Sequence, residues 1–349
     1  MMNPRVGACV FAACAAIVVL VGCNNSPSTT PAVTPTPVTT GPDTLYVQDG
    51  GSKTIRAYAH ASNLNGSAFP SAVYPTSDVS NPDVIFYEPY NILFYPSAYP
   101  SQTYSGVQST PIRVWTAATS KNGQNPDVMA AYNDGAGTAA YDPVHDLLFV
   151  ANVDGPKVQV YANAHLMTSG SLPAATVTLV ITDAGVVGTP RPQELYYDAL
   201  HDRLFASDEG SVVAVFDSFG STALGGGVRA ANRQIIGLYS PDGLAYSPAN
   251  DTLYIGEIAR RQIDVIHNAS TFNGGTSHTQ VINTFVTGPT GMAYDGAHDF
   301  LFVYDPLQIW MIPAPAVASG NVNNILNHHQ FFDASTELVG FGLSVDTVH

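Results

Sequence analysis

One short phrase recurs along this chain about every fifty residues, and a period of that length limits the chain to a few repeat architectures. Its clearest copies are AAYDPVHDLLFVAN from Ala139, LYYDALHDRLFASD from Leu195, LAYSPANDTLYIGE from Leu244 and MAYDGAHDFLFVYD from Met292. A weaker copy, IFYEPYNILFYPS, begins at Ile85. In each copy two apolar segments flank a polar turn, which predicts a β-hairpin.

Further apolar segments complete each unit. A third segment follows the hairpin at residues 158–161, 212–216 and 263–266, and a fourth precedes the next copy at residues 176–181 and 279–285. Four short strands in a unit of about fifty residues are typical of one β-propeller blade. We therefore predict an all-β propeller with four-stranded blades.

The two ends of the repeat region complement each other. GLSVDTVH at the C-terminus matches a first strand and its turn, whereas TLYVQDGGSKTIRAY from Thr44 matches a second and a third strand. One blade is then assembled from both ends, so that pairing of the terminal strands closes the ring and removes free sheet edges. The count becomes six blades, and five or seven remain possible if the unit around Ile85 is misassigned.

The first 23 residues have the features of a sorting signal. A basic Arg5 precedes an apolar stretch from Val10 to Val21 that is too short to span a membrane. Leu-Val-Gly-Cys at residues 20–23 resembles the bacterial lipobox, which implies that Cys23 is lipidated and becomes the first mature residue. The alternative is an ordinary secretory signal with a chance cysteine.

Residues 24–43 are rich in Ser, Thr and Pro and contain almost nothing to bury, so we expect a solvated tether. The propeller would then occupy residues 44–349. Asn24 differs from the aspartate of inner-membrane retention signals, which favours the outer membrane of a bacterial envelope. Cys9 and Cys14 lie within the signal, which leaves the mature chain without a free thiol.

The charge of the chain restricts its partners. A formal net charge of −15 repels phosphate backbones and anionic headgroups. We therefore expect no nucleic-acid partner, no membrane contact beyond the lipid anchor, and a monomer.

The segment LYVQDGGSKTIRAY at residues 45–58 and the segment PDGLAYSPANDTLYIGE from Pro241 resemble NHL and YVTN repeats. Those repeats combine a Pro-x-Gly start, an apolar strand, an Asp-containing turn and a Leu-Tyr-Val strand. The resemblance implies a six-bladed propeller of the TolB-like and gluconolactonase-like superfamily. The signatures of WD40 and kelch repeats are absent.

The same phrases are also similar to the gluconolactonase and regucalcin family of calcium-dependent lactonases, which would need several oxygen ligands at the channel. The second residue of each Pro-x-Gly phrase should face that channel. These residues are Asp83, Gly137, Gln193, Asp242, Thr290 and Phe341. Only two are carboxylates, and they fall in opposing blades. Asp242 and Thr290 stand where the lactonases present Asn and Asp, which puts metal-dependent hydrolysis in doubt, while the direction of the neighbouring Glu194 stays open.

His-Asp pairs recur at residues 145–146, 201–202 and 298–299 and look at first like acid-base dyads. All three occupy the turn between the first and second strands, where Asn or Asp suits a positive φ. Because successive blades are rotated around the ring, we expect the dyads to lie far apart and to serve the turns. For the same reason we expect the repeated aromatic residues of the second strands to form the core between blades. These aromatic residues are Tyr46, Phe149, Phe205, Tyr254 and Phe302.

An insertion at residues 96–111 interrupts the second blade between its second and third strands. Tyr99 and Tyr104 within it are candidates to overhang the channel mouth, where aromatic rings suit recognition. A tolerated surface insertion is the alternative.

No nucleophile elbow, zinc-protease motif or phosphate loop occurs in the sequence. We therefore predict a non-enzymatic binding module for an envelope protein, peptide or glycan, without a cofactor. The candidate ligand-binding residues are Asp83, Gln193, Asp242, Thr290, Tyr99 and Tyr104. A calcium-dependent lactonase and a purely structural scaffold are the alternatives.

Overall fold

The computed structural model describes most of the repeat region. The described residues are 43–76, 83–96, 102–104, 107–132, 136–152, 155–167, 175–182, 191–208, 210–275, 280–283, 285, 288–305, 308–325, 328–333 and 342–346. The chain divides into two units, Met1–Pro35 and Thr36–His349, and the first of them lies outside the described part, as does Cys23. Within the described residues, no helix has the length and apolar character needed to cross a membrane.

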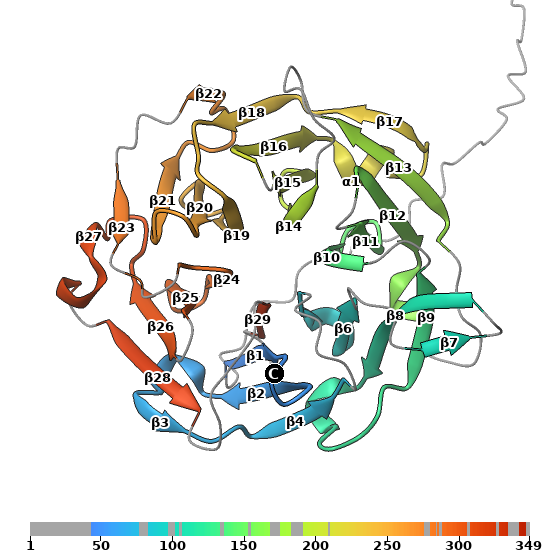
Figure 1. Cartoon of the computed structure of the whole chain (residues 1–349), viewed down its shortest axis with the longest axis horizontal. Helices are drawn as coiled ribbons and strands as arrows, with labels where there is room; N and C mark the ends of the chain where they lie inside the picture. Colours follow the sequence, from blue (N-terminus) through green and yellow to red (C-terminus); the bar gives the residue numbers. More distant parts are fainter. Residues whose placement is uncertain are drawn as a thin grey trace, which may run out of the picture. The chain divides into compact units, whose positions relative to one another are not determined.

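Six sheets are arranged as a ring around a central channel, each forming one blade (Figure 1). The first strand of every blade lies innermost, and neighbouring first strands contact one another around the ring. From blade 1 to blade 6 the first strands are β29 (Leu343–Asp346), β5 (Ile85–Tyr87), β10 (Ala136–Asp142), β14 (Pro192–Asp198), β19 (Pro241–Ser247) and β24 (Gly291–Asp295). The predicted all-β, six-bladed propeller is confirmed.

The second and third strands of each blade continue outward as an antiparallel meander. The second strands are β1 (Thr44–Asp49), β6 (Ile92–Pro96), β11 (Leu147–Asn152), β15 (Arg203–Asp208), β20 (Thr252–Glu257) and β25 (Phe300–Asp305). The third strands are β2 (Thr54–Ala59), β8 (Val107–Thr116), β12 (Lys157–Ala162), β16 (Val212–Asp217), β21 (Gln262–His267) and β26 (Gln308–Pro313). These hairpins confirm how the repeated phrase was interpreted.

A fourth antiparallel strand completes the meander in every blade. These strands are β4 (Ala72–Pro75), β9 (Val128–Tyr132), β13 (Val177–Thr182), β18 (Arg233–Ile236), β23 (Val281–Asn283) and β28 (His329–Asp333). In blade 2 the insertion adds β7 (Gln102–Tyr104), which pairs with the start of β8.

Besides blade 2 with β7, four further blades carry a fifth strand, so the expectation of four-stranded blades throughout was wrong. Each of these four strands pairs in parallel with the fourth strand of one blade and comes from the connection between the third and fourth strands of the next blade. These outer strands are β17 (Gly227–Ala230), β22 (Gly274–Gly275), β27 (Gly320–Asn321) and β3 (Gly66–Ala68) (Figure 1). The sequence analysis missed them because they are too short and polar to show a strand period.

Blade 1 combines both ends of the described region. β29 pairs antiparallel with β1, with Val345 opposite Leu45 and Ser344 opposite Tyr46. In addition, β3 from the connection after β2 pairs with β28 of blade 6. The contribution of these pairings to the stability of the ring stays a prediction.

Six apolar clusters of buried residues form the described core, and each of them joins two neighbouring blades. The repeated aromatic residues of the second strands belong to this core, as predicted. Tyr46 is 1 % exposed, while Phe149, Phe205, Tyr254 and Phe302 are fully buried. Packing between blades, and not any ligand cage, therefore explains their repetition.

Short helical turns follow the third strands or interrupt the connections. These are η1 (Ala61–Asn63), η3 (Ala118–Ser120), η4 (Ala164–Leu166), α1 (Phe219–Ala223), η2 (Glu88–Tyr90) and η5 (Val322–Asn324). Four of them begin after a residue with positive φ, namely His60, Ala117, Asn163 and Ser218. The chain thereby reverses direction at the outer end of the third strand.

Candidate functional site

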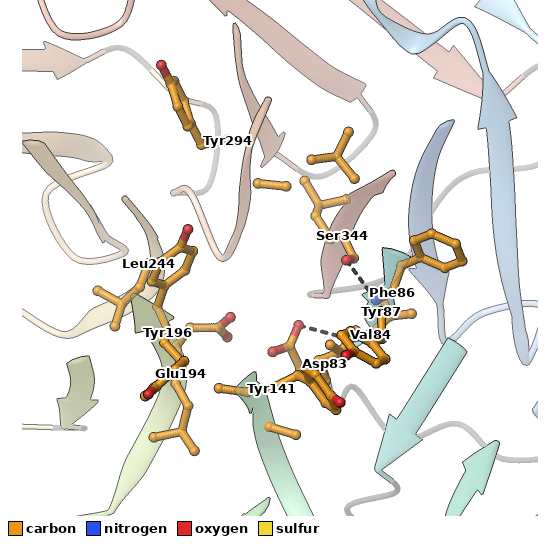
Figure 2. A pocket seen from close by; sticks show the side chains of 18 of the residues that line it. Asp83, Val84, Phe86, Tyr87, Tyr141, Glu194, Tyr196, Leu244, Tyr294 and Ser344 are labelled. Carbon is orange, nitrogen blue, oxygen red and sulfur yellow. Dashed lines mark hydrogen bonds between the residues drawn. The ribbon is translucent and has the colours of Figure 1, made fainter. Parts of the chain in front are cut away.

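A pocket of about 400 Å³ lies at the centre of the ring, where all six blades contribute their first strands (Figure 2). Its volume falls within the range of roughly 300 to 1,000 Å³ that is typical of ligand sites. Tyrosine rings and small apolar side chains form most of its wall, together with the acidic residues Asp83, Glu88 and Glu194. No Lys, Arg or His belongs to the wall formed by the described residues.

Asp83 lies at the start of β5 and is 7 % exposed. Its carboxylate accepts a hydrogen bond from the backbone N–H of Val84 at 2.9 Å and one from the hydroxyl of Thr138, on neighbouring β10, at 3.4 Å. Burial raises the pKa of Asp83, because the charged carboxylate loses its hydration. The prediction that Asp83 faces the channel agrees with this position.

Glu194 lies on β14 of blade 4 and reaches across the pocket toward Asp83 (Figure 2). The two carboxyl groups are close enough to influence each other, and their mutual repulsion opposes ionisation of both at once. Burial and the negative charge of Asp83 raise the pKa of Glu194 well above its ordinary value. The direction of Glu194, left open by the sequence, is therefore into the pocket.

Glycine occupies the position equivalent to Glu194 in several other blades, and in two of them a side chain would collide with the next blade. At the equivalent position of blade 5, a Cβ on Gly243 would lie 2.8 Å from the carbonyl oxygen of Thr290 in the next blade. In blade 1, a Cβ on Gly342 would lie 2.8 Å from the Cα of Asp83. Three of the six blades have glycine at this position and, apart from Glu194, none has a charged residue there, which was the signal that could have identified Glu194 from the sequence.

Asp242 lies on β19 close to these two carboxyl groups, although it is not part of the pocket wall. Burial raises the pKa of Asp242 to about 7, and the charge of Asp83 adds to that effect. The charge of Asp242 in turn helps to raise the pKa of Glu194. Asp83 and Asp242 do belong to opposing blades, but the channel is narrow enough for their charges to interact.

Two other predicted residues, Gln193 and Thr290, do not line the pocket. The side-chain amide of Gln193 donates to the carbonyl of Arg191 at 3.3 Å. Thr290 is 6 % exposed, and its hydroxyl finds no hydrogen-bond partner among the described residues. Both residues lie at the starts of first strands, as expected, but among the predicted residues whose side chains are described only Asp83 enters the pocket.

Tyr99 lies outside the described residues, as does Phe341, and of Tyr104 the structure describes only the backbone, at the end of β7. Figure 1 shows β7 at the outer side of blade 2, away from the ring centre. The contribution of this tyrosine pair to binding stays a prediction.

Tyrosines that mark the repeated phrase supply the aromatic wall of the pocket, which the sequence analysis did not anticipate. Tyr87, Tyr141, Tyr197 and Tyr294 all line the pocket. In three of these residues the hydroxyl donates to the aspartate of the His-Asp pair in the same blade, for example Tyr197 to Asp202 at 2.7 Å. The hydroxyls therefore anchor the turns while the rings face the channel.

The His-Asp turns make internal hydrogen bonds, in agreement with a role in the fold. His145 Nδ1 donates to Asp142 at 2.6 Å, and His201 Nδ1 donates to Asp198 at 2.7 Å. The aspartate of each His-Asp pair has a positive φ, as does Asp251 in blade 5. The φ values are 55° for Asp146, 52° for Asp202, 45° for Asp251 and 56° for Asp299. A tight turn explains the repetition.

The expectation that the dyads stay far apart was too strict. Oxygen and nitrogen atoms of Asp142 and His145 in blade 3 and of Asp202 in blade 4 lie within 4.8 Å of one another. Asp295 and His298 of blade 6 approach Asp43 of blade 1 in the same way. Neighbouring turns meet because adjacent blades pack directly against each other at this end of the ring.

Comparison with known proteins shows how common this fold is. No protein-family profile matches the sequence, and no curated protein matches it either. Among solved structures 1224 chains match, so the fold by itself cannot identify a function. The NHL and YVTN resemblance therefore stays a prediction.

A structure of a nidogen/laminin complex contains one such chain, with 11 % sequence identity and a TM-score of 0.56. The alignment covers 87 % of this protein and 98 % of that chain. A mitotic checkpoint complex contains another, with 13 % identity, a TM-score of 0.45, and coverage of 73 % and 67 %. The fold and its central site define the class of this protein, which is a six-bladed β-propeller.

Proposed function

We propose that this protein is a lipid-anchored binding module of the bacterial envelope, which holds a protein or peptide at the centre of its propeller without catalysing a reaction. The observation that carries the proposal is the central pocket, whose wall combines aromatic rings with the buried carboxyl groups of Asp83 and Glu194. Concave sites of this composition are typical ligand sites.

Asymmetry supports binding at this place. Residues repeated in every blade form the turns and the core, whereas the position of Asp83 holds a carboxylate in two blades and the position of Glu194 in one. An axial site must draw different groups from different blades, because a single ligand lacks the symmetry of the ring. The lipid anchor at Cys23 and an outer-membrane location complete the proposal and rest on the leader sequence alone.

A photo-crosslinking experiment in cells tests the proposal on the full-length lipoprotein. A photoreactive amino acid replaces Gln193, which is partly exposed beside Glu194, and in a control replaces Val228, which is 69 % exposed on outer strand β17. We expect a discrete protein or peptide adduct from position 193 that position 228 does not form. No adduct at position 193, or identical adducts at both positions, would contradict the proposal.

A calcium-dependent lactonase is the second candidate, favoured by the convergence of Asp83 and Glu194 on one pocket. Calcium would replace the proton that the two carboxyl groups retain and would stabilise the folded protein by mass action. Thermal unfolding with and without calcium, together with lactone hydrolysis assays, separates this candidate from pure binding. A calcium-dependent rise in melting temperature that Glu194→Gln abolishes, accompanied by hydrolysis, would favour the enzyme.

A further inference from the structure

Several buried carboxylates of this protein are paired with an arginine, and the carboxyl groups of the pocket differ from them. Asp49 and Asp333 both bind Arg56, at 3.0 and 2.7 Å. Outside the ring centre, the buried Glu257 is paired in the same manner with Arg260 at 3.2 Å. A buried carboxylate is costly unless a cation and hydrogen bonds compensate it, so these arginines are the expected solution.

The pocket contains the carboxyl groups of Asp83 and Glu194 without any basic residue in its described wall. Burial and the negative charge of Asp83 instead raise the pKa of Glu194, so that the pair retains a proton. Arg56 shows what a guanidinium does in this fold, because it bridges Asp49 of blade 1 and Asp333 of blade 6, and the hydroxyl of Tyr58 also donates to Asp333. Among the described residues of the pocket wall, no guanidinium plays this part.

We infer that the pocket binds the guanidinium group of an arginine side chain from the partner, which bridges Asp83 and Glu194 in the way that Arg56 bridges its two aspartates. The inference rests on the proposed function and specifies its ligand. The planar guanidinium carries five donors and can contact two carboxylates at once. The ring of Tyr196, which lies beside Glu194 in the pocket wall, offers a π face for the same cation (Figure 2).

A metal ion fits this arrangement less well. Two other clusters of described residues bring three ligand atoms within 4.8 Å of one another, but Asp83, Glu194 and Asp242 do not form such a set. A single calcium ion therefore could not be held directly by all three carboxylates, whereas a guanidinium several ångströms wide spans separated oxygens. The pocket volume of about 400 Å³ also accommodates a side chain and not only an ion.

Binding of the guanidinium must release the retained proton. Before binding, the pair Asp83 and Glu194 holds one proton on one of its two carboxyl groups; afterwards both groups are carboxylates and the proton passes to the solvent. Nearby Asp242, with its pKa raised to about 7, ionises in the same range. Affinity should therefore increase as the pH rises from about 6 to about 8.

Isothermal titration calorimetry on the whole lipoprotein in detergent tests the inference. The probe is N-acetyl-argininamide, and the matched neutral probe is N-acetyl-citrullinamide, which has a urea in place of the guanidinium. We expect the arginine probe to bind, to release protons in a buffer-dependent heat, and to weaken about tenfold or more in Glu194→Gln. The citrulline probe should bind at least about tenfold more weakly than the arginine probe.

Asp127→Asn is the control variant, because it removes one negative charge from an exposed ion pair with Lys121 in blade 2, away from the pocket. It should leave affinity unchanged. Absence of arginine-probe binding, equal binding of both probes, or equal weakening in Glu194→Gln and Asp127→Asn would each overturn the inference. Calcium binding with no response to the arginine probe would assign the pocket to a metal instead.

The two proposals fail in different ways. A protein adduct at position 193 together with no arginine-probe binding leaves the binding module intact and removes the guanidinium. Arginine-probe binding with no adduct in cells leaves a cation site and removes the protein partner.

Discussion

Aspartates in the repeated turns and aspartates in the channel have opposite roles in this protein. In the turns, Asp202 accepts hydrogen bonds from the backbone N–H of Gly220 at 2.6 Å and from the hydroxyl of Tyr197 at 2.7 Å, and these donors lower its pKa against the effect of burial. In the channel, Asp83 and Asp242 have raised pKa values because they are removed from water near other acids. The environment, and not the residue type, distinguishes structure from site.

Replacing the turn aspartate should destabilise the fold. Asp202→Ala removes these hydrogen bonds, together with those from the backbone N–H of Ser221, and puts alanine at a φ of 52°, so we expect a loss of about 2 to 3 kcal/mol in the free energy of unfolding. Asp202→Asn keeps an acceptor and tolerates positive φ, and should lose about half as much. His201→Ala, at the exposed end of the same turn, should cost less than about 1 kcal/mol. Urea denaturation measures all three, and equal losses would contradict this interpretation.

The channel acids should make stability fall with rising pH. A carboxyl group whose pKa is raised in the folded state binds protons more strongly there than in the unfolded state, so the free energy of unfolding decreases between the ordinary value of about 4 and the folded value. For Asp242 the folded pKa is about 7. Asp242→Asn should therefore flatten this decrease by on the order of 1 to 2 kcal/mol.

Asp127→Asn provides the contrast, because Lys121 and the hydrogen bonds from Thr116 lower the pKa of Asp127. Its charge adds stability that is present above the ordinary pKa and is lost as the pH falls through the folded pKa. The Asn variant should thus lose stability at neutral pH. Denaturation at a series of pH values from about 4 to about 8 checks both signs, and a parallel response of the two variants would contradict the assignment.

At the scale of strands, the blades are joined by more than side-chain packing. Each of the parallel strands β17, β22, β27 and β3 lies on the edge of one blade but belongs to the chain of the next. These strands pair with edges that would otherwise be exposed and would invite association with other chains. Blade 1 is held from both sides, through β29 on β1 and through β3 on β28.

Removal of the terminal strand should affect the whole ring. Deletion of residues 340–349 removes β29, which pairs with β1 and lies between the first strands of blades 2 and 6. We expect a loss of several kcal/mol, because the edge of β1 and part of the apolar interface become exposed. Deletion of residues 30–39 from the Thr/Pro-rich tether is the control and should change little. An unchanged melting temperature after the terminal deletion would contradict ring closure by β29.

At the scale of the molecule, six similar blades produce a channel that is not symmetric. Apolar clusters between blades repeat around the ring, whereas the acids of the pocket come from blades 2 and 4. For the chain ahead of the propeller, the proposal adds a lipid at Cys23, with residues 24–43 as the expected tether.

Cys23→Ser should release the protein from the membrane. The serine has no thiol to accept the lipid, so we expect an uncleaved or soluble product, while the unaltered protein fractionates with membranes and begins at an acylated Cys23. Cys14→Ser lies within the same leader and should change neither result. Membrane fractionation with mass spectrometry of the N-terminus measures this, and a mature chain that begins elsewhere would contradict it.

The sequence by itself determined the repeat and therefore the class of fold. Apolar strands, Asn or Asp turns with positive φ and the aromatic residues between blades could all be predicted, because local backbone preference and burial act within one unit. The position of Asp83 at the channel followed from the same repeat. These features depend on contacts that every blade reproduces.

Only the tertiary structure decided which groups meet at the axis. The contact between Asp83 and Glu194 joins residues of blades 2 and 4, and its formation depends on channel width, which no repeat unit encodes alone. The short fifth strands likewise exist only because the edge of a neighbouring blade supplies their hydrogen-bond partners. Sequence periodicity reports what each blade does for itself, whereas the site and the links between blades arise from the way in which unlike positions are brought together.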